Sequence, residues 1–221
     1  SESRKPVEFL RSMVNVPNKQ GYSFRPIVPS AGVPGFPIPP NFEDEEQCPE
    51  RVNRFPHAKA TMGTCMSMCT ASQIETRFQG APLFERFVDG DPTSRRIDPN
   101  RAVKVFVKSA ADTSQPPSDI RPPWVLQRTM QFLIQLLDRD DQPFHNTYSF
   151  FWERFRGINQ DYSTQDFFDE IQLQSLEQIS RFNILSQYIL CEDEGFRGMS
   201  EKYNREQLTK SYVTLKRGCE L

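Results

Sequence analysis

Hydrophobic residues recur every three or four positions over most of the chain beyond residue 70. The pattern is clearest in three stretches, 124–137, 146–162 and 163–193, which each have an apolar side and a polar side. This spacing predicts amphipathic helices. Alternating apolar and polar runs bounded by hairpin turns are absent from the sequence, so the strand signal is weak. The sequence therefore predicts an all-α fold.

The stretch from Ser163 to about Asp193 is predicted to form the longest helix, with Ser163 as its N-cap. At 1.5 Å per residue such a helix would extend roughly 40 Å. Its broad apolar stripe comprises Phe168, Ile171, Ser175, Leu176, Ile179, Phe182, Leu185 and Ile189. A stripe this broad needs neighbours on both sides. We therefore expect stacked antiparallel helix pairs that form a helical-repeat-like array.

Start signals predict two more helices. Thr70 and Gln73 have the spacing of a capping box and precede a short helix. The motif NREQ, which begins at Asn204, opens a final helix.

A basic helix is predicted over 98–112, because Asp98 can cap it and Pro99 suits its first position. Its apolar side comprises Ala102, Val105, Phe106 and Ser109, and its polar side is basic. With two preceding arginines, the candidate nucleic-acid-binding residues are Arg95, Arg96, Arg101, Lys104 and Lys108. Clustered cations favour nucleic acid through counterion release. The alternatives are a solvent-exposed helix face and a binding surface for an acidic partner.

Closely spaced prolines dominate the chain up to about residue 40, and an acidic cluster follows at 42–50. Proline fixes φ, removes a backbone donor and disfavours helix in the residue before it. We therefore expect residues 1–60 to form an extended or disordered arm, either a solvated linker or a peptide that orders on a partner. Residues 61–221 form the predicted helical domain.

The 221 residues carry a formal net charge of -2, which excludes a strongly basic nucleic-acid binder of the simple kind. The five cysteines show no disulfide-framework spacing, and no signal peptide is recognisable, which favours a reducing compartment. Apolar runs of about 18 residues are also missing, so we expect no membrane-spanning segment.

The motif GTCMSMCT, residues 63–70, suggests a metal site or a redox pair as alternatives to simple packing. A structural zinc needs four ligands. Cys65 and Cys69 supply one loose pair, while Cys48 and His57 lie upstream at irregular spacing. Redox pairs usually have two intervening residues, and this pair has three. Buried packing of small polarizable side chains is therefore favoured, and the sequence predicts no metal and no cofactor.

Catalytic signatures are missing from the sequence, which has no phosphate-cradling glycine loop, no GxSxG elbow and no HExxH motif. The carboxylates of Glu153, Asp161 and Asp166 could approach one another, but we expect them on solvated faces or in helix pairing. The sequence therefore predicts a protein that is not an enzyme.

Six motifs follow one another along about residues 62 to 217: GTCMSMCT, NRAVKVFVKSAAD, PSDIRPPWVLQRTMQFL, FFWERFRGINQDYS, SLEQISRFNILSQYILCED and NREQLTKSYVTLKR. In this order they resemble the GANP family, the germinal-centre-associated nuclear protein and its fungal relatives. The resemblance implies a SAC/GANP domain of stacked helix pairs that leads into a winged helix. We expect the chain to hold the N-terminal part of this domain and to lack the winged helix.

The same resemblance implies a non-enzymatic nuclear scaffold that couples transcription to mRNA export at pore complexes of the nuclear envelope. Its implied partners are a PCI-domain protein, a small acidic protein of the proteasome-lid type, and RNA or DNA. Other parts of the full-length protein would provide the association with the pore. The residues that match family motifs, with an expected structural role, are Gly63, Cys65, Cys69, Arg121, Pro122, Arg154, Arg156 and Asp161. The three arginines among them are predicted to tie helices together.

Four positions depart from the family pattern. Met66 and Thr70 stand where proline is usual, and Asn159 and Asn183 stand where basic or histidine residues are common. Two other hypotheses stay open. One is a PCI-type helical scaffold of a proteasome-lid or translation assembly, and the other is a metal-dependent enzyme built around the cysteine pair.

Overall fold

The computed structural model describes residues 62–77, 80–87, 95–108, 115–137, 142–165 and 168–219. The arm predicted over 1–60 and its acidic cluster lie outside the described residues.

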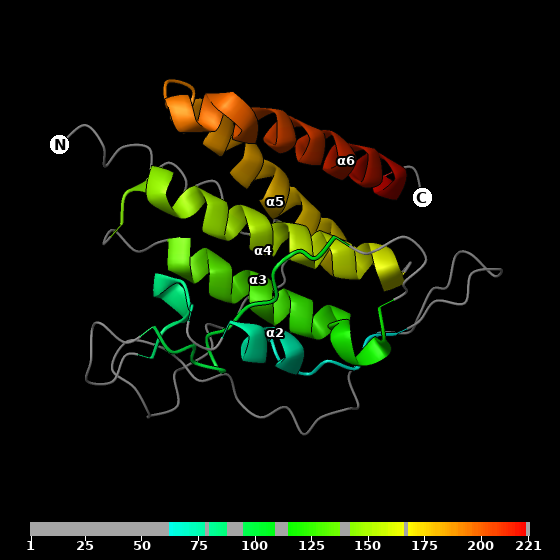
Figure 1. The fold of residues 1–221 in the computed structure, drawn as a ribbon. Coiled ribbons are helices and arrows are strands. Elements are labelled where there is room, and N and C mark those ends of the chain that lie inside the picture. Colours follow the sequence, from blue (N-terminus) through cyan, green and yellow to red (C-terminus); the bar gives the residue numbers. More distant parts are fainter. Residues whose placement is uncertain are drawn as a thin grey trace.

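The described residues are mainly helical. The helices are α2 (Ala71–Thr76), α3 (Pro123–Leu137), α4 (Phe144–Gln165), α5 (Glu170–Ile189) and α6 (Glu201–Cys219). Short 3-10 helices span Leu83–Glu85 and Pro117–Asp119, and a π-helix spans Phe196–Ser200. Figure 1 shows α3, α4, α5 and α6 following one another across the stack, with α2 at the α3 end. Over these residues the only bridge between extended segments joins Arg86 to Ile97, so the all-α prediction is confirmed.

The starts of the first helices follow the sequence signals. Thr70 caps α2, and its side chain accepts a hydrogen bond from the Gln73 backbone N–H. The carbonyl of Pro122 accepts hydrogen bonds from Val125 and Leu126 as α3 begins. Pro123, the first residue of α3, loses nothing there, because the first N–H groups of a helix have no partner inside it.

The boundary between α4 and α5 corrects the prediction for the longest helix. Ser163 does not start a helix but lies inside α4, where its hydroxyl donates to the Asn159 carbonyl 2.8 Å away. The cap of α5 is Asp169, which accepts from the Gln172 backbone N–H at 2.7 Å. Serine can bond the preceding turn as well as cap the next one, so its spacing alone was ambiguous. α4, with 22 residues, is longer than α5, with 20.

The last helix also begins earlier than predicted. α6 starts at Glu201, and Asn204 is buried within it instead of capping it. The Asn204 amide donates to the Asn183 carbonyl of α5 at 2.8 Å, and its oxygen accepts from the Tyr148 hydroxyl of α4 at 3.2 Å. A residue that resembles a cap in the sequence therefore joins three helices.

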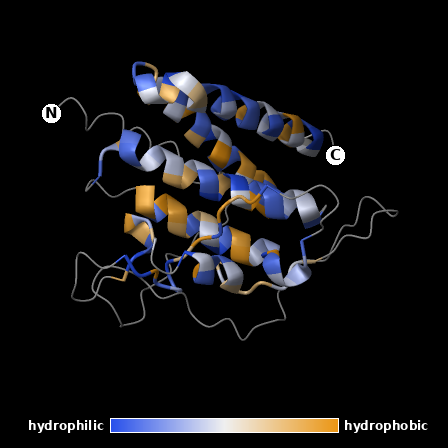
Figure 2. Ribbon diagram, in the orientation of Figure 1, coloured by the Kyte–Doolittle hydropathy of each residue, from blue (hydrophilic) through white to orange (hydrophobic). Residues whose placement is uncertain are grey.

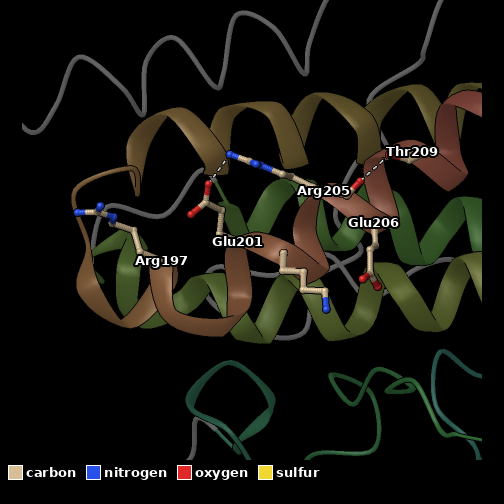
Figure 3. Close-up of a pocket in the computed structure, with 6 residues that line it drawn as sticks. Arg197, Glu201, Arg205, Glu206 and Thr209 are labelled. Atoms are coloured by element: carbon tan, nitrogen blue, oxygen red, sulfur yellow. Dashed lines mark hydrogen bonds and ion pairs between the residues drawn. The ribbon is translucent and has the colours of Figure 1, made fainter.

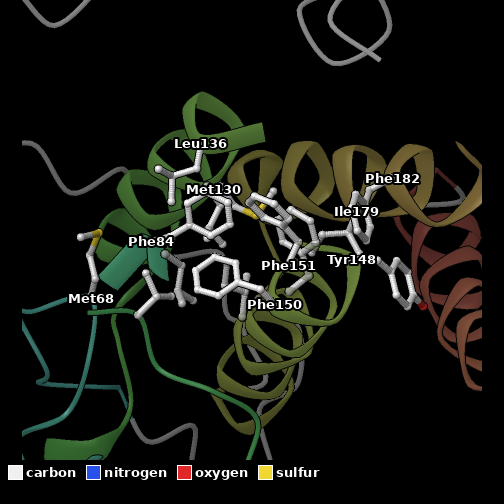
Figure 4. Close-up of a cluster of buried hydrophobic side chains, with 14 of the residues drawn as sticks. Met68, Phe84, Met130, Leu136, Tyr148, Phe150, Phe151, Ile179 and Phe182 are labelled. Atoms are coloured by element: carbon white, nitrogen blue, oxygen red, sulfur yellow. The ribbon is translucent and has the colours of Figure 1, made fainter. Parts of the chain in front are cut away.

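Aromatic side chains fill the core between α3, α4 and α5. Phe182 of α5 lies 4.9 Å from Phe155 and 5.9 Å from Tyr148 between ring centroids. Phe84, from the 3-10 helix Leu83–Glu85, packs in the same core, with its ring centroid 5.0 Å from that of Phe150 (Figure 4). Figure 2 shows hydrophobic residues concentrated on α3 and α5, whereas α6 is largely hydrophilic. Among the described helices, none has the length and apolar character needed to cross a membrane.

The helix predicted over 98–112 does not form over 98–108, the part of it that the structure describes. Residues 99–101 form a turn, in which the Asn100 N–H donates to the Asp98 carboxylate, and residues 102–108 have no helical structure. The Lys104 N–H donates to the Met68 carbonyl at 2.9 Å, and the Phe106 N–H donates to the Glu153 carbonyl at 3.3 Å. The run VKVFV has β-branched and aromatic residues, which favour extended backbone. The segment therefore lies between the 63–70 motif and α4.

A buried carboxylate holds these segments together. Asp161 of α4 accepts hydrogen bonds from Lys104 Nζ and Arg121 Nε, both at 2.6 Å, and all three side chains are at most 2% exposed. Arg121 Nη1 also donates to the Met68 carbonyl at 3.1 Å. The expectation that Asp161 lies on a solvated face or in simple helix pairing is therefore wrong. We call Lys104, Arg121 and Asp161 the Asp161 cluster.

The substitution Asp161→Asn should strongly destabilise the fold, because it leaves two buried cations without their carboxylate. Loss of one partner from a buried ion pair costs about 3–5 kcal/mol, which urea unfolding followed by circular dichroism would measure. Glu177→Gln is the matched control, since Glu177 pairs with Arg181 on the surface of α5 and such pairs contribute about 0.5 kcal/mol. Equal effects of the two substitutions would contradict the structural role of the Asp161 cluster.

Gly63→Ala should also destabilise the fold. An added Cβ would lie 2.2 Å from the Ile120 carbonyl oxygen, so one backbone segment must move away. We expect a loss of about 1–3 kcal/mol in the free energy of unfolding, as for other overpacked sites. Gly198→Ala is the control, because a Cβ there meets no atom within 4 Å. A Gly63→Ala variant as stable as the parent chain would show that the segments are not packed so closely.

Candidate functional site

The predicted basic residues do not share one exposed face. Lys104 is part of the Asp161 cluster, and Arg101 is 8% exposed with its Nε donating to the Phe84 carbonyl at 3.0 Å. Arg95, Arg96 and Lys108 are exposed. The predicted face fails because the helix that would have aligned these residues does not form.

The two cysteines of the 63–70 motif are buried and free. Cys69 Sγ accepts a hydrogen bond from Arg77 Nη2 at 2.9 Å. Burial raises the pKa of the Cys69 thiol, although Arg77 acts in the opposite direction. Cys48 and His57 lie outside the described residues, and within the described ranges no three His, Cys, Asp or Glu side chains come together as a metal site would require. Both cysteine side chains pack in the interior, with Cys65 at 7% and Cys69 at 0% exposure.

Glu85 forms a second buried ion cluster with two arginines. Its carboxylate accepts from Arg77 Nη1 at 2.6 Å and from Arg154 Nε and Nη2 at 3.0 and 2.9 Å. It also accepts the Val103 N–H at 3.1 Å. Arg154 was predicted to tie helices together. Its contacts with Glu85 connect α4 to the 3-10 helix Leu83–Glu85. Burial lowers the pKa of Arg154, and the nearby Glu85 carboxylate opposes this shift.

Gly63 and Gln165 join the motif to the end of α4. The Gly63 N–H donates to Gln165 Oε1 at 3.0 Å, and Gln165 Nε2 donates to the Arg121 carbonyl at 2.9 Å. The residues that match the family motifs thus lie mainly in one connected region of the interior.

Arg156 differs from Arg121 and Arg154, because it lies at the surface of α4. Its guanidinium carbon is 3.8 Å from the centroid of the Phe106 ring and 4.5 Å from that of the Trp152 ring. Such contacts hold the planar group by cation–π attraction. Among the described residues Arg156 forms no ion pair, and its ring contacts join α4 to the extended segment that carries Phe106.

Arg156 lines a groove of about 330 Å³, which we call the α4–α6 groove. One wall is α4, with Arg156, Asn159 and Ser163, and the opposite wall is α6, with Gln207, Lys210 and Thr214. Gln172 and Leu176 of α5 also line it, as does Phe106 from the extended segment. The sequence did not predict this groove, because its residues come from four separate segments. Of the residues that match the family motifs, only Arg156 lines it.

A second hollow, of about 370 Å³, lies on α6 and is formed by side chains of that helix and the preceding π-helix (Figure 3). Arg205 is paired there with Glu201, one turn away. The charged side chains of both signs form an ordinary solvated helix face.

Exposed apolar side chains mark the turn between α5 and α6. Tyr188 is 74% exposed and Met199 is 67% exposed. Ile184, at 42%, lies four residues before Tyr188 and therefore on the same side of α5. We call Ile184, Tyr188 and Met199 the apolar turn residues.

Comparison with known proteins identifies the family of the chain. The model of the SAC3/GANP family matches residues 68–218. SAC3 family protein 1 of Schizosaccharomyces pombe is 35% identical over 166 residues, which is 75% of this chain and 16% of that protein. SAC3 family protein B of Arabidopsis thaliana is 35% identical over 185 residues, 80% of this chain and 10% of that protein.

Protein xmas of Drosophila melanogaster is 30% identical over 176 residues, 75% of this chain and 8% of that protein. The chain therefore spans less than a fifth of the length of these relatives. The family match extends from residue 68 to residue 218 and so includes α2 to α5 and nearly all of α6. The chain belongs to the SAC3/GANP family.

Proposed function

We propose that the chain is the N-terminal part of a helical scaffold that couples transcription to mRNA export at the nuclear pore. Family membership supports this proposal, because the SAC3/GANP family is associated with mRNA export scaffolds. It also makes the runner-up, a scaffold of a proteasome-lid or translation assembly, the weaker hypothesis. The chain acts by holding proteins together and not by catalysis.

The observation that carries the proposal is the exposure of the apolar turn residues at one end of the stack. Tyrosine and methionine are enriched at protein interfaces, where they contribute large contact areas. Three such side chains at one end of a helical array suit the docking of another helical domain. We propose that this end binds the PCI-domain partner, with the small acidic protein in the same assembly.

Tyr188→Glu combined with Met199→Glu should reduce capture of the PCI-domain partner at least about tenfold, because hot-spot residues of an interface contribute about 2 kcal/mol or more each. The measurement is affinity capture of the tagged chain from nuclear extract, with the PCI-domain protein and its acidic subunit quantified by mass spectrometry.

Met66→Glu is the control, because Met66 is 58% exposed but belongs to the segment at the α2 end of the stack (Figure 1). Undiminished capture by the double variant would remove the apolar turn residues from the interface.

Nucleic-acid binding stays a prediction for Arg95, Arg96 and Lys108, whose side chains are exposed. Changing all three to Glu should weaken binding of single-stranded RNA and flatten its salt dependence, because each lost phosphate contact lowers the slope by about 0.7. Fluorescence anisotropy over a series of salt concentrations would measure both effects.

The matched control changes Arg197, Lys202 and Arg205 of the other hollow to Glu, which alters the net charge equally. If both triple variants lose affinity to the same extent, the effect is one of total charge and the predicted site is wrong.

A further inference from the structure

The α4–α6 groove has the composition of a ligand site. α6 packs on α5, and the groove runs between α6 and the second half of α4. Its lining combines two cations, several amide and hydroxyl side chains, and the rings of Phe106 and Tyr162. Nothing in the proposed partner contact at the apolar turn residues uses this groove.

Arg156 is a preorganised cation that forms no ion pair within the part of the chain that the structure describes. Its contacts with Phe106 and Trp152 fix the plane of the guanidinium group, so a ligand would not have to restrict a flexible side chain. Burial lowers the pKa of Arg156, and the carboxylates of Glu153 and Glu206 oppose that shift. A carboxylate delivered by a ligand would therefore compensate a cation that the fold leaves partly desolvated.

Lys210 provides the second cation from the opposite wall. It lines the same groove from α6 and is exposed. It forms no ion pair within the described ranges. Two cations on facing helices can bind the same acidic segment, which fixes its direction as well as its position.

The charges near the groove favour a peptide over a nucleic acid. Asn159, Gln172 and Ser211 line the groove, and their side-chain oxygens are buried without a hydrogen-bond partner among the described residues. Glu153 and Glu206, close enough to influence Arg156, repel a polyanion more strongly than a single carboxylate.

We propose that the α4–α6 groove binds an extended acidic peptide segment of a partner protein, with its carboxylates at Arg156 and Lys210 and its main chain along the polar lining. The site is distinct from the apolar turn residues, so it would add a second contact to one partner or recruit another.

The test is a titration of the ¹⁵N-labelled 221-residue chain with the acetylated peptide Ala-Glu-Ala-Glu-Ala, followed by NMR. We expect the Arg156 side-chain N–H signal and the backbone amides of 207–214 to shift together. The same peptide with Gln in place of Glu should bind about tenfold more weakly, because its hydrogen bonds lose their ionic component.

Arg156→Lys and Lys210→Ala should each weaken binding by a factor of about ten, since the first loses the forked guanidinium and the second loses the charge. Lys202→Ala is the control, because Lys202 lines the separate hollow on α6 and its loss should leave the affinity unchanged. Circular dichroism would establish that each variant is folded.

Three results would overturn the proposal: no shift at the groove, equal binding of the Glu and Gln peptides, or tighter binding of a heptauridylate RNA with the same set of shifts. The last result would assign the groove to nucleic acid. None of them bears on capture of the PCI-domain partner, so this proposal and the proposed function can fail separately.

Discussion

The carboxylate of Asp161 is the interaction on which the arrangement of the non-helical segments depends. Lys104 and Arg121 approach it from two segments far apart in sequence, and both cations are buried. A buried cation without a counter-charge is costly, so neither segment can move without the other. The Lys104 N–H and the Arg121 guanidinium both reach the Met68 carbonyl, which places the 63–70 motif in the same assembly. Cys69, with no exposed surface, fits there because it is small.

Two arginines in one motif of α4 have different environments, one buried and one beside the groove. Arg154 and Arg156 are two residues apart, so they point to different sides of the helix. Arg154 is held against the fully buried Glu85, whereas Arg156 rests on two aromatic rings beside the groove. The sequence FWERFRG does not distinguish them, because the difference comes from what packs on each side of α4.

Local patterns predicted α2 and α3 well, because the cap at Thr70 and the apolar spacing of α3 are signals between residues close together in the sequence. Local patterns failed over 98–108. The apolar residues of VKVFV are compatible both with one face of a helix and with an extended segment. Tertiary hydrogen bonds to Met68 and Glu153 decide the outcome. The burial of Asp161 and Lys104 could not be predicted either, since their pairing links positions 57 residues apart. The family resemblance identified the motifs in their order along the chain. It did not indicate which of their charged residues are buried.

The α4–α6 groove persists because α6 is fixed at both ends. At one end, Asn204 is hydrogen-bonded to α5 and to Tyr148 of α4. At the other end, Gly218 lies so close to the start of α5 that an added Cβ would be 2.4 Å from the Phe168 ring. Buried hydrogen bonds such as those of Asn204 each contribute only about 1 kcal/mol to stability. Their main effect is to fix the position of the helix. A largely hydrophilic helix held in this way leaves its side toward α4 open, and the groove is the consequence of that geometry.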